Sequence, residues 1–186
     1  FIKNINAAKL VLLEQDQIID KSYFASGKTI DIKGTINGDA FLAGSEIIVS
    51  GKINGNLFVA GNTLNIIGEV NGSIFGAGNV LTIGANNING GFLAGNLVNL
   101  NSKINKNAYI AGNLITISNT SEIGQDLFAS GSSINLNANI GRDLSIKSSS
   151  ASINSIINRD ASIISNSISF NGNTKINNNL ESQNQE

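Results

Sequence analysis

The chain has 186 residues, a formal net charge of −1 and only 13% charged residues. This composition lacks the basic stripe of a nucleic-acid-binding protein, and no apolar run reaches the length of a membrane-spanning helix. His and Cys are both absent, which excludes disulfides, Ser-His-Asp or Cys-His catalysis and most zinc and iron sites. Ile, Leu and Val alternate with Asn, Ser, Thr and Gly, which is typical of strands and turns.

Residues 1–26 predict a lead-in segment and a partial first coil. Leu13 and Ile19 stand at positions that hold Ile, Leu or Val in the later repeats, whereas Gln15 replaces an expected Ile. The chain starts at Phe1 and contains no Met, so we interpret it as an excised or processed piece.

Residues 27–172 repeat with a period of 17 residues. The clearest column is a glycine, followed by Ser at its last two positions: Gly27, Gly44, Gly61, Gly78, Gly95, Gly112, Gly131, Ser148 and Ser165. Apolar columns follow three and five residues later, with a mostly polar residue between them, and this alternation indicates a strand with one buried face. A third apolar column holds Ile36, Ile53, Val70, Ile104, Ile123, Ile140 and Ile157, with Ile88 one place late.

Asn-Gly pairs follow the third column four times, and because Asn-Gly tolerates positive φ, each pair predicts a bend. A hairpin meander would mirror its columns between neighbouring strands instead of repeating them. The sequence therefore predicts an all-β fold, a single-stranded right-handed parallel β-helix with three sides and about nine coils of 17 residues. Residues 173–186 predict a polar C-terminal tail that frays.

Two polar columns could carry chemistry. Asp126, Asp143 and Asp160 would stack on adjacent coils, either as a cation site or sugar-cleaving carboxylate pair, or as caps of a bend; we favour the caps. A second column follows the repeated glycine, and we favour a structural amide ladder there over a recognition stripe. Its members are Asn62, Asn79, Asn96 and Asn113.

An aromatic column holds most of the aromatic residues: Phe24, Phe41, Phe58, Phe75, Phe92, Tyr109 and Phe128. In the last coils its position is taken by Ser145 and Ser162, while the flanking residues stay apolar. Serine in place of a core Phe would cost several kcal/mol, so we predict that the column points outward and forms an interaction stripe. Its expected partner is a membrane, a neighbouring filament or another segment of the same protein. Outward placement predicts that Phe58→Ser changes stability by under about 1 kcal/mol.

The unit from Gly38 to Gly44, followed by Ile47 to Gly51, resembles the Gly-Asp-x-aromatic-x-Ala-Gly repeat of bactofilin-like polymer-forming proteins of bacteria. The segment from Gln17 to Gly27 is similar to the entry segment of their longer, envelope-associated relatives, and the resemblance covers roughly residues 11–170. It implies a right-handed three-sided β-helix that assembles end to end without nucleotide, often at a membrane. The aromatic column and the long lead-in depart from the short cytoskeletal members.

The predicted function is a self-assembling structural scaffold of the bacterial cell envelope or cytoskeleton, with no enzymatic activity and no cofactor. Its expected partners are copies of itself and a membrane or envelope component, and nucleic acid is not among them. The alternative is a carbohydrate-binding or carbohydrate-cleaving β-helix of the adhesin or tail-spike type. Such proteins usually carry long loops, whereas the largest insertion here is two residues, in the 118–122 stretch.

Overall fold

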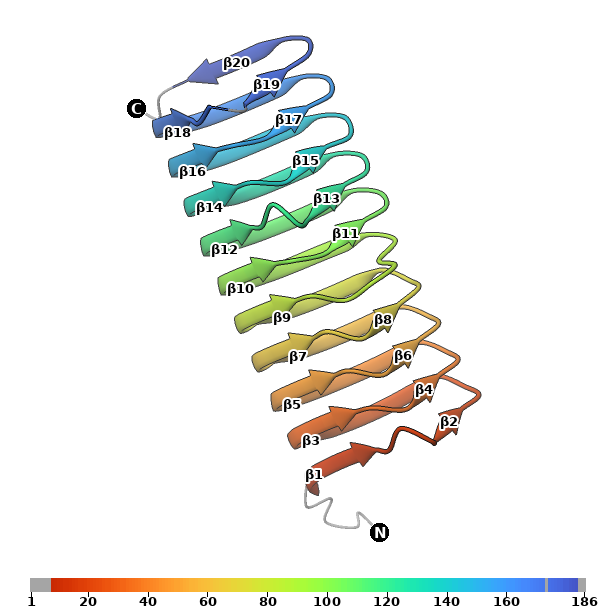
Figure 1. Ribbon diagram of the computed structural model, residues 1–186. Coiled ribbons are helices and arrows are strands. Elements are labelled where there is room, and N and C mark those ends of the chain that lie inside the picture. Colours follow the sequence, from red (N-terminus) through yellow and green to blue (C-terminus); the bar gives the residue numbers. More distant parts are fainter. Residues whose placement is uncertain (1–7, 173, 184–186) are drawn as a thin grey trace.

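The computed structural model describes residues 8–172 and 174–183, and every regular element within these ranges is a β-strand. The strands pair in parallel about 17 residues apart and form a solenoid of about ten turns, which confirms the predicted parallel β-helix. Figure 1 shows the long strands stacked one above another, with β1 (Ala8–Leu13) at one end of the rod and β20 (Leu180–Gln183) at the other.

Long and short strands alternate along most of the chain. The described long strands have ten residues each: β3 (Tyr23–Ile32), β5 (Ala40–Val49), β7 (Leu57–Ile66), β9 (Ile74–Ile83), β10 (Gly91–Leu100), β12 (Ala108–Ile117), β14 (Leu127–Leu136), β16 (Leu144–Ile153) and β18 (Ala161–Phe170). The short strands have two residues each: β2 (Ile18–Ile19), β4 (Thr35–Ile36), β6 (Lys52–Ile53), β8 (Glu69–Val70), β11 (Lys103–Ile104), β13 (Glu122–Ile123), β15 (Asn139–Ile140), β17 (Ile156–Ile157) and β19 (Lys175–Ile176).

Each long strand supplies two sides of a turn. In β5, Ala40 and Leu42 are buried before Gly44, whereas Ile47 and Val49 are buried after it. The inward alternation thus shifts by one residue at the glycine, because the strand bends there. The short strand that follows forms the third side, and its second residue points into the core, as Ile53 does in β6.

The core consists of the predicted apolar columns. Their Ile, Leu and Val side chains are almost all fully buried from β3 to β16, and they form one continuous cluster along the rod. The parallel pairing extends beyond the predicted limits of 27–172 on both sides. β3 begins at Tyr23, and β19 and β20 continue the stack within 174–183.

The third side changes at residues 84–90, where the late position of Ile88 predicts a slip. The long strands form one 11-stranded sheet together with β1 and β20, but the short strands form separate sheets of four and five strands on the two sides of this segment. Asn87, with a φ of 65°, is the described non-glycine residue in the left-handed region, and Ile88 is fully buried despite its shift. The segment therefore adjusts the chain path without opening the core.

The glycines at the corners serve a different purpose from the predicted one. No glycine in the described ranges has a positive φ, so the predicted bends at the Asn-Gly pairs form without the left-handed conformation that Asn-Gly tolerates. A Cβ on Gly55 would lie 2.6 Å from the carbonyl oxygen of Gly38, and one on Gly61 would lie 2.2 Å from that of Gly44. Glycine suits these two positions because the backbones of successive turns approach closely there.

Candidate functional site

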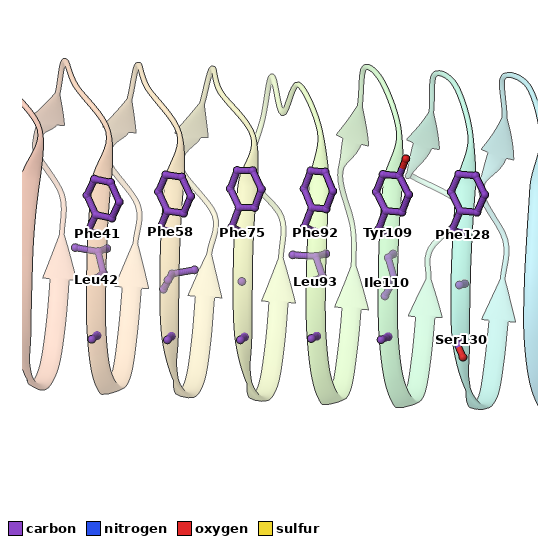
Figure 2. A pocket seen from close by; sticks show the side chains of 18 of the residues that line it. Phe41, Leu42, Phe58, Phe75, Phe92, Leu93, Tyr109, Ile110, Phe128 and Ser130 are labelled. Carbon is purple, nitrogen blue, oxygen red and sulfur yellow. The ribbon is translucent and has the colours of Figure 1, made fainter.

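The predicted aromatic column lies on the outside of the rod and forms a continuous row, which we call the aromatic ridge (Figure 2). Each ring stands on the second residue of a long strand, and the parallel register pairs it with the ring of the next turn, as in Phe41 with Phe58. Neighbouring rings are stacked with centroids 4.6–5.0 Å apart and planes within 8° of parallel. Six such steps make the ridge roughly 29 Å long.

The rings expose their edges and cover one another's faces. Phe24 begins the ridge and is 71% exposed, while Phe128 ends it and is 41% exposed. Between them each ring has a neighbour on both faces. Sugar binding by aromatic side chains relies on a free ring face, as does cation–π binding. Along the ridge these faces are already occupied by other rings, so its exposed edges suit an apolar partner.

A second feature of the same face is a row of small exposed residues two positions after each ring, which we call the alanine shelf. It consists of Ala43, Ala60, Ala77, Ala94 and Ala111, continued by Ser130 and Lys147. Between ridge and shelf lie inward-pointing residues such as Leu42, Leu93 and Ile110, which Figure 2 shows on the long strands β5, β10 and β12. Sequence reasoning did not single out this shelf, although its signal is present as the Ala of the repeat.

Ridge and shelf together line an open groove of about 920 Å³ that runs along the rod. Its lining is apolar over most of its length, and Lys147 at one end is its one charged residue among those described. The aromatic positions of the next turns are taken by Ser145 and Ser162, whose flanking residues are buried. The groove thus ends where both the ridge and the shelf become polar.

The aspartate column acts within the structure, as the bend-capping interpretation predicts. Asp126 Oδ1 accepts hydrogen bonds from the backbone N–H of Asp143 at 3.2 Å and from Arg142 Nε at 2.9 Å. Asp143 Oδ1 in turn accepts from the backbone N–H of Asp160 at 3.2 Å and lies 3.4 Å from Arg159 Nε. The hydrogen bond and charge of Arg142 hold the pKa of Asp126 below its ordinary value, against the opposing effect of burial.

The same device occurs in other turns, where Asp39, Asn56 and Asn107 accept from the backbone N–H one turn further on. No cluster of acidic side chains arranged to hold a metal ion occurs among the described residues. The aspartates therefore cap backbone groups and pair with arginines.

The amide ladder lies in a different column from the predicted one. Asn54 Nδ2 donates to Asn37 Oδ1 at 2.7 Å, and Asn71 Nδ2 donates to Asn54 Oδ1 at 2.8 Å. Asn37 Nδ2 extends the ladder to Asp20 Oδ1 at 2.6 Å. The predicted ladder of Asn62, Asn79, Asn96 and Asn113 was wrong, because these described side chains are exposed and do not bond to one another.

Both ends of the solenoid expose an incomplete turn. At the N-terminal end β1 pairs with the second half of β3, from Gly27 to Ile32, and no described strand covers Tyr23–Ser26 on that side. At the C-terminal end β20 pairs with the first half of β18, Ala161–Ile164, and the second half has no described outer partner. Among the described residues, each end is therefore an edge that is covered over half of its long strand.

Within residues 8–172 and 174–183, the core columns continue to these edges, where their side chains become more exposed. Phe170 and Leu180 occupy inward positions that are fully buried in the middle of the rod, yet they are 44% and 45% exposed. Val11, Ile19 and Tyr23 are only partly buried at the other end. Removing such side chains from water favours contact with a further turn.

Comparison of the chain with protein-family models, curated proteins and solved structures gives no match. The resemblance to bactofilin-like proteins therefore stays a prediction. Within residues 8–172 and 174–183, no helix is long and apolar enough to cross a membrane.

Proposed function

We propose that this chain is a self-assembling structural scaffold, a bactofilin-like polymer-forming protein of the bacterial envelope or cytoskeleton, whose copies join head to tail. The observation that supports it is the complementarity of the two half-covered ends. The C-terminal end carries the first half of a turn, β20, and the N-terminal end carries the second half, β1. Placed end to end, these two strands would together take the place of one long strand, and β2 would supply the third side of that turn.

The register of the joint follows from the pairing inside the rod. Leu180 stands in the column that contains Ala161 and, in the first long strand, Tyr23. β20 of one copy would therefore pair with Tyr23–Ser26 of the next. In the same way Ser167–Phe170 would pair with Leu10–Leu13 of the next copy, because both stretches share the columns of Thr29–Ile32.

This joint covers the exposed inward side chains of the C-terminal end, Phe170 and Leu180. Phe170 would lie over Leu13 of the next copy, and Leu180 over Tyr23, so that the apolar columns continue from one rod to the next. Burial of each half-exposed apolar side chain contributes about 1 kcal/mol, and the new strand pairs satisfy backbone groups that water otherwise solvates. The joint is thus built from the same contacts as the turns themselves.

The alternative function, binding or cleavage of carbohydrate, has weaker support. The ring faces that would stack on sugars are covered by neighbouring rings, and Asp126 and Asp143 are engaged by backbone N–H groups and arginines. No enzymatic activity and no cofactor form part of the proposal.

Two end variants test the proposal. Phe170→Lys places a charge in the core column of the C-terminal edge, and Val11→Lys does so at the N-terminal edge; both side chains are partly exposed, so each rod can fold. A matched control is Ser169→Lys, whose side chain is exposed on the same strand. We expect filaments of the unaltered chain and of the control by electron microscopy, and monomers of each end variant by light scattering.

Mixing the two end variants decides the polarity of the joint. The Phe170→Lys chain keeps an intact N-terminal end, and the Val11→Lys chain keeps an intact C-terminal end. If the joint is head to tail, these two ends can meet once, so the mixture should give dimers that grow no further. Dimers of one variant alone would instead indicate joints between like ends. A chain that stays monomeric at high concentration, or a Phe170→Lys variant that assembles as the unaltered chain does, would overturn the proposal.

A further inference from the structure

The outer face that carries the aromatic ridge has the profile of a step. The ridge occupies the second residue of each long strand and the alanine shelf the fourth, so the two rows run side by side along the rod. In β9, for example, Phe75 presents a ring on this face, and two positions later Ala77 presents only a methyl group. Polar residues such as Ser73 and Asn107 flank the other side of the ridge.

We propose that a second copy of this chain docks on this face, with the aromatic ridge of each rod seated on the alanine shelf of the other. A two-fold axis parallel to the rods turns one face towards the other and exchanges the sides of ridge and shelf. This places ridge over shelf twice and leaves the two rods parallel. A two-fold axis across the rods would make them antiparallel and would bring ridge against ridge, which leaves both shelves empty.

The parallel arrangement also keeps the two copies in register, because rotation about the rod axis does not change height along it. Phe75 of one copy then lies over Ala77 of the other, and the same holds for every turn of the ridge because ring spacing is equal in both copies. In the turn where the shelf becomes Lys147, the ridge becomes Ser145. The ammonium group therefore meets a hydroxyl instead of a ring.

The polar ring of the ridge fits the same arrangement. Tyr109 Oη lies 3.4 Å from Asn107 Nδ2, on the side of the ridge that faces away from the shelf. Its hydroxyl is therefore outside the proposed contact. Asp39, Asp126 and Asp143 follow the same flank, so acidic groups accompany the ridge. Because Asp126 and Asp143 pair with Arg142 and Arg159, this flank has no excess of positive charge to attract an anionic membrane surface, which leaves a second copy as the occupant we argue for.

The area of the contact indicates that single rods pair weakly and that filaments pair strongly. Ridge and shelf are roughly 29 Å long and about 10 Å wide, or about 300 Å² per copy, whereas a stable pair of proteins buries about 800 Å² per partner. Two free rods should therefore pair weakly. Rods joined end to end repeat the contact in every copy, which makes pairing of filaments strong through multivalency. The inference thus rests on the proposed function.

The test compares charges on the shelf with charges just beyond it. Ala77→Asp combined with Ala94→Asp places carboxylates under the partner's rings, while Asn79→Asp combined with Asn96→Asp adds the same charge to exposed sites on the same two strands. By electron microscopy we expect paired filaments of the unaltered chain and of the asparagine variant. The alanine variant should give single filaments of unchanged length.

Cross-linking reports the direction of the pair. Ser145→Cys and Lys147→Cys chains, assembled together and treated with a short bis-maleimide, should link to each other in the parallel pair, since the chain has no other Cys. In an antiparallel pair centred on the ridge both sites lie beyond the partner's ridge, and that link is lost.

The outcomes separate this inference from the proposed function. Single filaments of the unaltered chain, or pairs that survive the shelf charges, would overturn the inference and leave end-to-end assembly standing. Absence of filaments would overturn both. Binding to vesicles of phosphatidylcholine and phosphatidylglycerol that the alanine variant loses, without any filament pairing, would assign the face to a membrane and overturn the proposed partner.

Discussion

Stacking between neighbouring rings should appear as a measurable coupling within the aromatic ridge. Phe58 and Phe75 are stacked at 4.7 Å with planes 6° apart, and such a pair contributes about 0.5–1.5 kcal/mol beyond its buried area. A double-mutant cycle of Phe58→Ser and Phe75→Ser should therefore give a coupling of about 1 kcal/mol. Because Phe58 also stacks on Phe41, its single substitution should cost about 2–3 kcal/mol, more than sequence alone predicts for an exposed ring.

The assay is urea unfolding followed by far-UV circular dichroism, at concentrations where the midpoint does not depend on assembly. The control cycle pairs Phe41 with Phe92, which lie three stacking steps or about 14 Å apart, and its coupling should stay within about 0.3 kcal/mol. A coupling of that small size for the adjacent pair, or equal couplings in both cycles, would refute the reasoning.

Three further predictions concern the corners and the aspartate column. Gly61→Ala should lower the unfolding midpoint strongly because its Cβ would meet the carbonyl of Gly44, whereas Gly84→Ala should not, since its nearest neighbour lies 3.6 Å away. Arg142→Gln should lower stability at neutral pH. Because its pKa is lowered in the fold, ionised Asp126 stabilises the fold at a pH above the ordinary carboxyl pKa, and this stabilisation is lost as the pH falls through the lowered pKa. The unfolding midpoints of Arg142→Gln and of the unaltered chain should therefore converge in acid. Replacing Asp126, Asp143 and Asp160 with Asn should leave assembly intact, as sedimentation would show.

The architecture could be predicted because several columns of the repeat indicate it independently. Period-two alternation after each glycine identifies the buried face of a strand, and a constant period of 17 residues excludes mirrored hairpins. The outward direction of the ridge followed from the exchange of Phe128 for Ser145 between apolar neighbours. Such reasoning works where a wrong placement would carry a large energetic cost.

Periodicity reveals which residues share a column but not how their side chains turn. The columns containing Asn54 and Asn62 have the same spacing, yet in the structure only the first forms an amide ladder. Glycine suits both a left-handed backbone and a close approach, so Gly55 alone could not distinguish the two. The alanine shelf could not be predicted because replacing an exposed alanine has little energetic cost, and the shelf has meaning only beside the aromatic ridge.

Extension of the ridge gives the last prediction. Phe128 has a ring neighbour on one face only, and Ser145 stands on its open side in the same outward column. Ser145→Phe should add one stacked pair and raise the unfolding free energy by about 1 kcal/mol, since the buried residues Leu144 and Ile146 stay in place. The control is Ser152→Phe, which has outward neighbours Asn135 and Ser169 instead of a ring. Equal effects of the two substitutions would mean that ring stacking adds nothing to the rod. A gain at Ser145 alone would show that the ridge ends there for a reason other than stability, which agrees with a partner's Lys147 occupying the space beside it.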